Sequence, residues 1–287
     1  MNYSQIKVDY SKCRDCGICA DECPNHKKKN GHSHVDHDYE FCDRCLHCYA
    51  VCPANAIVVN EKEQAFKKIK VEPDSLTSLF MHRRSYRRFL DKPLSDINIE
   101  KLIKAATYIP SGGNDHRINI TVLTAIEKRI ELLSAIVEYY AHIKKLLKNP
   151  LLRIVAKQFG DAKVKATLKD PFYFKKILKH IEDIKNVDDP VFYHAPSVFI
   201  FHTDRIMPTA KEDCILSAYN VVLMSETLGL GSCFVSLSQQ AITNSKKCKN
   251  ILSIPKSHRV EAVVIVGHPK RIYMRPALRK AKQVELV

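Results

Sequence analysis

Two cysteine runs of the same form constrain this chain more than any other feature. Each run has three cysteines with two residues between neighbours, then a fourth cysteine after three more residues, directly before a proline. The eight positions are Cys13, Cys16, Cys19 and Cys23 in the first run and Cys42, Cys45, Cys48 and Cys52 in the second. Because a [4Fe–4S] cluster needs four thiolate ligands, this pattern predicts two such clusters.

The pattern also predicts which cysteines share a cluster. Three cysteines at this spacing wrap one side of a cluster, and the chain has then left the site. In runs that end in Cys-Pro, the fourth cysteine ligates the other cluster. We therefore expect Cys52 to complete the cluster of the first run and Cys23 to complete the cluster of the second.

Zinc and disulfide bonds explain these cysteines less well. A zinc ribbon uses two pairs of cysteines and leaves the third cysteine of each run unexplained. Disulfide bonds need an oxidising compartment, whereas the start of the chain lacks the apolar segment of a signal peptide. We therefore expect a cytoplasmic protein. We also expect no membrane span, because no stretch of the sequence approaches about 20 apolar residues.

Residues 1–60 resemble a bacterial ferredoxin with two [4Fe–4S] clusters. Residues 8–10 and 38–40 are expected as equivalent short strands before the two runs, and residues 54–60 as a closing strand. The loop between the runs carries four histidines, which are His26, His32, His34 and His37. We interpret this loop as a polar surface loop rather than a further metal site, since no cysteine or carboxylate set completes a tetrahedral site.

The remainder of the chain is long enough for a second and larger domain. Its 287 residues suit one small domain and one of about 200 residues. We place a linker at residues 61–76 and the second domain at residues 77–287. Residues 1–60 hold seven Lys and Arg against eight Asp and Glu, so residues 61–287 carry a net charge of +16, against +15 for the whole chain.

This division of charge suggests the kind of partner. A basic body attracts an acidic electron donor, such as a low-potential ferredoxin. Nucleic acid is the other usual partner of a basic chain. We do not expect it here, because the lysines and arginines are scattered along predicted helices.

An arginine-rich stretch begins the second domain. It reads Arg83-Arg84-Ser85-Tyr86-Arg87-Arg88-Phe89. Guanidinium groups and a hydroxyl can encircle one phosphate, although a solvated basic surface is the simpler alternative. Ser95 then caps a predicted helix that ends near Tyr108, and a loop Pro110-Ser111-Gly112-Gly113-Asn114 follows. Its glycines allow the backbone to approach a flat ligand closely.

The order of these motifs is similar to that of the flavin nitroreductase family, which residues 77–287 resemble. The resemblance implies an α+β homodimer that holds FMN at the dimer interface. It implies that the FMN phosphate and ribityl end are held by Arg83, Arg84, Ser85 and Arg87, with Arg275 and Arg279 from the tail. It also implies flavin contacts by Ser111, Gly112 and Asn114, from the partner subunit. It implies that the backbone amides of Ser236 and Leu237 lie at flavin N5, with Phe234 beside them, although an ordinary helix-to-strand turn would also fit this segment.

One departure from the family concerns the segment after this loop. The family often continues with Gln-Pro-Trp, whereas this chain has His116-Arg117-Ile118. His116 either lies near the flavin or braces the loop. The departure keeps open a second hypothesis, a non-catalytic redox sensor or electron-storage protein with a degenerate flavin site.

Hydrophobic periodicity predicts the remaining elements. Helices are expected at residues 76–81, 126–148 and 213–227, with largely helical structure at residues 150–190. Strands are expected at residues 118–124, 197–201 and 260–267. The leftover cysteines are expected as buried thiols without chemistry, and they are Cys214, Cys233 and Cys248.

These observations predict an iron–sulfur flavoprotein oxidoreductase of the α+β class. Electrons from the two clusters would reach FMN and pass to a small-molecule acceptor, which would be a nitroaromatic, a quinone or a conjugated alkene. We name no catalytic side chain, because the flavin itself carries the redox chemistry.

Overall fold

The computed structural model describes most of the chain. The described residues are 6–23, 31–37, 41–59, 69–159, 169–170, 172, 175, 179, 182, 188–204, 208–280 and 283–286. They form two compact units, of which unit 1 is Met1–Val71 with Ser111–His116, and unit 2 is Glu72–Pro110 with Arg117–Val287. None of the described helices is both long and apolar enough to cross a membrane. The boundaries 1–60, 61–76 and 77–287 stay a prediction.

The described residues of unit 1 include two short strands and two short α-helices. Strand β1 (Ile6–Val8) pairs antiparallel with β2 (Ile57–Val59). Helices α1 (Ile18–Asp21) and α2 (His47–Val51) each follow the first two cysteines of a run. Strand β1 thus lies slightly earlier than predicted, β2 lies inside the predicted strand, and residues 38–40 lie outside the described residues.

The two helices of unit 1 begin in the same unusual way. Their N-caps, Gly17 and Leu46, adopt left-handed backbone conformations with φ of 76° and 63°. Glycine tolerates this conformation, whereas it costs a residue such as leucine about 1–2 kcal/mol. The same left-handed conformation thus occurs at the corresponding position of both runs, directly after the second cysteine.

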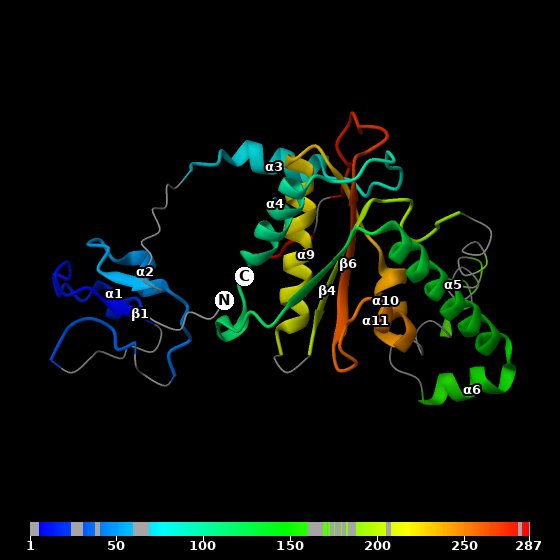
Figure 1. The fold of residues 1–287 in the computed structure, drawn as a ribbon, viewed down its shortest axis with the longest axis horizontal. Coiled ribbons are helices and arrows are strands. Elements are labelled where there is room, and N and C mark those ends of the chain that lie inside the picture. The colour runs from blue at the N-terminus through cyan, green and yellow to red at the C-terminus, as the bar shows by residue number, and fades with distance from the viewer. Residues whose placement is uncertain are drawn as a thin grey trace. The chain divides into compact units, whose positions relative to one another are not determined.

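Unit 2 is a four-stranded antiparallel sheet with helices on both faces. The sheet order is β3-β4-β6-β5, with β3 (Asn119–Leu123), β4 (Ser197–Thr203), β5 (Gly231–Phe234) and β6 (Arg259–Gly267). Helices α4 (Asp96–Thr107) and α9 (Ala210–Thr227) cover one face. Helices α5 (Ile126–Lys148), α10 (Ser236–Asn244) and α11 (Lys246–Ile251) cover the other, as Figure 1 shows.

The side chains of β4 point alternately into two hydrophobic cores, one on each face of the sheet. Val198 and Ile200 pack with α5 and α10, while Phe199 and Phe201 pack with α4 and α9. Successive side chains of a strand point to opposite faces, so a strand buried on both faces reads as an unbroken apolar run. This arrangement confirms the predicted α+β class.

Most predicted elements of unit 2 are confirmed, with shifted ends. The Ser95 hydroxyl accepts a hydrogen bond from the Asn98 amide at 3.3 Å and caps α4 as expected. Helix α3 (Pro73–His82) and helix α9 both begin earlier than predicted. Helix α6 (Pro150–Phe159) confirms the start of the region at 150–190, most of which lies outside the described residues. Helices α10 and α11 were not predicted.

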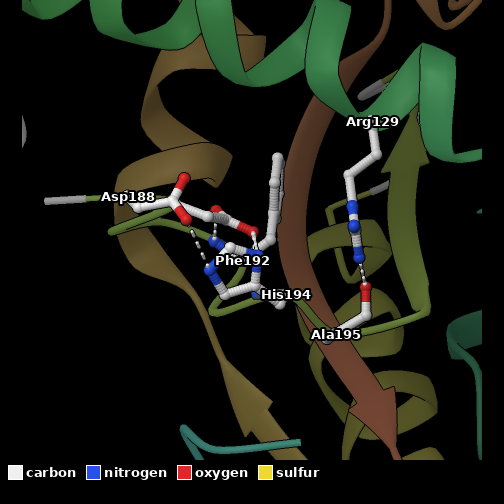
Figure 2. Close-up of polar contacts among 6 residues, drawn as sticks. Arg129, Asp188, Phe192, His194 and Ala195 are labelled. Carbon is white, nitrogen blue, oxygen red and sulfur yellow. Dashed lines mark hydrogen bonds and ion pairs between the residues drawn. The ribbon is translucent and has the colours of Figure 1, made fainter. Parts of the chain in front are cut away.

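A tight turn before β4 is held by one buried carboxylate. Asp189 is 6% exposed, and its Oδ1 and Oδ2 accept the amides of Phe192 at 2.8 Å and His194 at 2.7 Å. Figure 2 shows this turn together with Arg129 of α5, which donates to the carbonyl of Ala195. Asp189 and His194 both have positive φ, at 45° and 59°. The carboxylate therefore supports a backbone that is strained on its own.

Replacing Asp189 with alanine should lower the free energy of unfolding by about 3 kcal/mol, because two buried amides lose a charged acceptor. The neighbouring Asp188 offers a matched control. Its side chain is 94% exposed and lies 3.4 Å from His194 Nε2, so Asp188→Ala should cost about 0.5 kcal/mol or less. Denaturant titrations followed by circular dichroism measure both values. Equal losses in the two variants would contradict the role given to Asp189.

Candidate functional site

The eight cysteines of the two runs line two pockets in unit 1. One pocket is lined by Cys13, Cys16, Cys19 and Cys52. The other is lined by Cys23, Cys42, Cys45 and Cys48. Each run thus contributes three cysteines to one pocket and its fourth cysteine to the other. This grouping supports the expected exchange of ligands, which stays a prediction.

Backbone amides donate to two of the cysteine sulfurs, whereas burial disfavours the free thiolate of Cys48. The Asp15 amide donates to Cys13 Sγ at 3.4 Å, and the Ala56 amide donates to Cys52 Sγ at 3.2 Å. Burial raises the pKa of the Cys48 thiol to about 12. Binding of iron must therefore displace a proton that the buried thiol holds at neutral pH.

A buried histidine lies beside the cysteines of the first pocket. His34 lines this pocket and is 3% exposed, so the prediction of a polar surface loop is wrong for this residue. Its Nδ1 lies 3.0 Å from the Val35 carbonyl oxygen, and its Nε2 has no hydrogen-bond partner in the described structure. The fit of the pockets to a cluster rests on their donor sets, because four cysteine sulfurs line each pocket and a [4Fe–4S] cluster takes four thiolate ligands.

The other described histidines of this loop, His32 and His37, are less buried than His34. His32 is exposed and stacks on His34, with ring centroids 5.0 Å apart. His26 lies outside the described residues. That this loop holds no metal site of its own stays a prediction.

In unit 2, the arginine-rich stretch runs beside the end of β5. The Tyr86 amide donates to the Ser232 carbonyl at 2.9 Å, and the rings of Tyr86 and Phe89 are buried. Gly231 makes this approach possible, because a Cβ there would lie 2.6 Å from Tyr86 Cγ. The two rings anchor the stretch in the core, so that Arg87 is exposed and Arg83 is partly exposed. The backbone of the basic run is therefore anchored to the sheet, and its binding of a phosphate stays a prediction.

The C-terminal tail meets this stretch at Arg84. Arg84 Nη2 donates to the carbonyl oxygens of Arg275 and Pro276, both at 3.3 Å, and its Cζ lies 5.6 Å from the Tyr273 ring centroid. Arg84 Nε is buried and has no partner among the described residues. The structure thus brings Arg275 beside the arginine stretch, and Arg279 is exposed further along the tail. A phosphate oxygen is a suitable acceptor for such a buried guanidinium N–H.

The segment after β5 offers backbone donors. Phe234 is 42% exposed, and Ser236 and Leu237 are the first two residues of α10. The first amides of a helix have no acceptor within that helix. The Tyr140 hydroxyl donates to the Leu237 carbonyl at 2.8 Å and holds this first turn in place. A bridge between Ser85 and Ser232 sets the arginine stretch beside the same strand.

The glycine loop is placed differently from the other predicted flavin residues. It forms a short helix, η1 (Gly112–Asn114), and belongs to unit 1. The Asn114 side-chain amide donates to the carbonyls of Asp43 at 3.2 Å and Arg44 at 2.9 Å. His116 Nε2 lies 2.8 Å from Asn114 Oδ1, and its amide donates to Ser111 Oγ at 3.1 Å. His116 therefore braces the loop, and the flavin contacts of Ser111, Gly112 and Asn114 stay a prediction.

Sequence reasoning missed one neighbour of the arginine stretch. Tyr193 lies in the strained turn before β4, and the Arg87 Cζ is 6.0 Å from its ring centroid. Its φ of 53° is unusual for an aromatic residue, and no local sequence pattern predicts it.

The three remaining cysteines, Cys214, Cys233 and Cys248, are buried as predicted. Burial raises the pKa of the Cys233 thiol, although Arg87 lowers it in part.

Comparisons with known proteins match this two-part organisation. Residues 80–268 match the model of the nitroreductase family, and residues 5–70 match that of a 4Fe-4S dicluster domain. A putative NADH dehydrogenase/NAD(P)H nitroreductase of Archaeoglobus fulgidus is 26% identical over 188 residues, which is 66% of this chain and 82% of the relative. An uncharacterized ferredoxin of Methanocaldococcus jannaschii is 40% identical over 60 residues, which is 19% of this chain and 77% of the ferredoxin.

A solved structure supports the fold of unit 2. A nitroreductase with bound FMN from Desulfitobacterium hafniense has a TM-score of 0.54 at 18% identity, covering 74% of this chain and 97% of that one. The family match itself extends over more than half of the chain. The chain therefore belongs to the nitroreductase family of oxidoreductases and carries a 4Fe-4S dicluster domain ahead of its family domain.

Proposed function

We propose that the chain is an iron–sulfur flavoprotein reductase that binds FMN in unit 2. The observation that carries this proposal has three parts. The arginine stretch bridges to the edge strand β5 at Ser232, Arg84 donates to the tail at Arg275, and α10 begins two residues after β5. The FMN in the Desulfitobacterium hafniense protein supports this proposal. So does the buried Arg84 Nε, which lacks a partner among the described residues.

Each group of residues has a distinct role in this proposal. The guanidinium groups of Arg83, Arg84 and Arg87, with the Ser85 hydroxyl, hold the phosphate and ribityl end, and Arg275 and Arg279 add charge from the tail. The amides of Ser236 and Leu237 orient the ring system, beside the exposed ring of Phe234. Bound FMN supplies the redox chemistry, since a flavin accepts electrons from one partner and delivers them to another.

The dicluster domain supplies the electrons in this proposal. A low-potential donor, such as an acidic ferredoxin, delivers them singly to unit 1, and they leave in pairs to a nitroaromatic, quinone or conjugated alkene. The fusion of a cluster domain with a nitroreductase domain in one chain supports this route. The name of the Archaeoglobus fulgidus relative suggests the competing route, in which a nicotinamide reduces the flavin directly.

An anaerobic donor test separates these routes. Reduced ferredoxin is mixed with the full chain carrying both clusters and FMN, and with a Cys45→Ala variant whose second cluster is impaired. We expect rapid loss of flavin absorbance in the wild type and slow loss in the variant. The internal route is wrong if the clusters become reduced while the flavin stays oxidised over turnover times, or if NADPH alone reduces the flavin faster. Steady turnover of a quinone distinguishes a reductase from the redox-sensor alternative.

The family resemblance also leads us to propose a homodimer. Light scattering on the loaded chain measures the molar mass, and a value near 32.8 kDa would contradict this proposal.

A further inference from the structure

We propose that Tyr193 is a positioning residue of the FMN site, which keeps the guanidinium group of Arg87 oriented for the phosphate and ribityl end of the cofactor. This inference rests on the proposed function, because it adds a further residue to the same site. It does not depend on the clusters, on the electron donor or on the acceptor. Tyr193 lies outside every sequence motif that indicated a flavin.

The contact between the two side chains places a cation over an aromatic ring. Arg87 Cζ lies 6.0 Å from the centroid of the Tyr193 ring. The ring is partly buried and packs against the hydrophobic core that includes residues of α5 and α10, whereas Arg87 is exposed. The negative face of an aromatic ring attracts a guanidinium group at such a distance. The contact therefore joins an exposed charge to a ring that the core holds.

The ring is placed by a turn that is fixed at both ends. At one end, the buried carboxylate of Asp189 accepts two backbone amides, and the Tyr193 amide donates to the Asp189 carbonyl at 3.2 Å. At the other end, Arg129 of α5 donates to the carbonyl of Ala195, as Figure 2 shows. Phe192, directly before Tyr193, is fully buried. Tyr193 thus lies between two points at which the turn is tied to the rest of unit 2.

The backbone of this turn is unfavourable without such support. Asp189, Tyr193 and His194 have positive φ, at 45°, 53° and 59°. Residues with a Cβ avoid this conformation, although asparagine tolerates it better than an aromatic residue does. Strained backbones cluster at ligand sites, where the surrounding structure fixes a geometry that the site needs. Because asparagine or glycine would suit the turn better, the aromatic ring is the feature that position 193 provides.

The orientation of Arg87 matters because its side chain is long and exposed. Such a side chain has many rotamers, and binding a phosphate restricts it to a few. Burial raises the pKa of the Cys233 thiol and the charge of Arg87 lowers it in part, which indicates that the guanidinium lies near β5. The group is thus bounded by β5 and by the Tyr193 ring. Restricting it before FMN binds lowers the entropy lost on binding and raises the affinity.

The test is a double-mutant cycle on the FMN affinity of the full chain carrying both clusters. Tyr193→Asn removes the ring and keeps a residue that tolerates positive φ. We expect the dissociation constant, measured by quenching of FMN fluorescence, to rise about fivefold. In a chain with Arg87→Ala, the same substitution should change this constant less than about twofold, because the contact is already lost. A ring that only supported the fold would weaken binding equally in both chains.

Two further variants separate the ring from the turn. Tyr193→Phe keeps the ring face and should bind FMN within about twofold of the wild type. His194→Asn is the matched control, because this neighbour also has positive φ but its exposed imidazole Nε2 lies 3.4 Å from Asp188 Oδ2. It should leave the dissociation constant unchanged.

Fluorination of the ring decides the question even where Tyr193→Asn fails to fold. Fluorinated phenylalanines in place of Tyr193 keep the shape of the ring and reduce the negative charge of its face, so the dissociation constant should rise with each added fluorine. The inference is overturned if fluorination has no effect, if Tyr193→Asn acts equally with and without Arg87, or if His194→Asn weakens binding as much. A wild type that binds no FMN would instead refute the proposed function.

Discussion

Replacing Cys52 with alanine should expose Cys13, Cys16 and Cys19, although Cys52 belongs to the other cysteine run. These four residues line one pocket, so the variant removes one of four thiolates from the first cluster site. About half of the bound iron and sulfide should be lost. Alkylation under anaerobic conditions, followed by mass spectrometry, should label the cysteines of the first run strongly. Cys42, Cys45 and Cys48 should stay protected.

Cys23→Ala is the matched reverse experiment. Cys23 lines the second pocket, so its loss should expose Cys42, Cys45 and Cys48 and leave the first three cysteines protected. Cys248→Ala removes a buried thiol of unit 2 and should leave the iron content unchanged. If Cys52→Ala instead labels the cysteines of its own run, each cluster is held by one run and the exchange of ligands is refuted.

A double substitution, Arg83→Ala with Arg87→Ala, should weaken FMN binding by at least about 100-fold. Two charge-assisted hydrogen bonds to a phosphate are lost, each contributing about 1.5–3 kcal/mol. Quenching of FMN fluorescence during a titration with the protein measures the dissociation constant. The cluster content of unit 1 should remain unchanged, which shows that the loss is confined to the flavin site.

Arg88 provides the control for charge alone. It is exposed in the same stretch, and its backbone carbonyl accepts the Lys270 amide at 3.0 Å, an interaction that a side-chain truncation retains. Arg88→Ala should weaken FMN binding less than about threefold, as expected for a distant surface charge. A loss as large as that of the double variant would mean that general basic charge, rather than the proposed phosphate contacts, attracts the flavin.

The cysteine spacing and the strand patterns could be read from the sequence because they are local or strictly periodic. Ser95 at a helix start and the unbroken apolar run at 197–201 are patterns whose meaning depends on few neighbours. Helix α10 was missed because Ser236–Asn244 is mostly polar, and its helical form depends on packing of Ala241 and Ile242 against the sheet. Such tertiary support often overrides weak local preference.

Residues whose roles depend on distant partners could not be predicted. Arg84 was expected to face a phosphate, yet its Nη2 also holds the tail at Arg275, which is far away in sequence. His34 reads as one polar residue in a polar loop, and only the folded unit 1 buries it against the first pocket. Asp189 and Tyr193 belong to a turn with positive φ angles, which their residue types do not predict.

The sequence by itself determined the two sets of cluster-binding cysteines and the order of the other motifs. Both can be predicted because cysteine spacing and the periodicity of helices and strands are properties of short stretches of chain. The tertiary structure decided which cysteines share a pocket, which arginines remain outside the core beside β5, and which histidine lies at each cluster site. These outcomes depend on segments far apart in the chain that burial of apolar surface brings together, such as Tyr86 beside Gly231 and Cys52 beside Cys13.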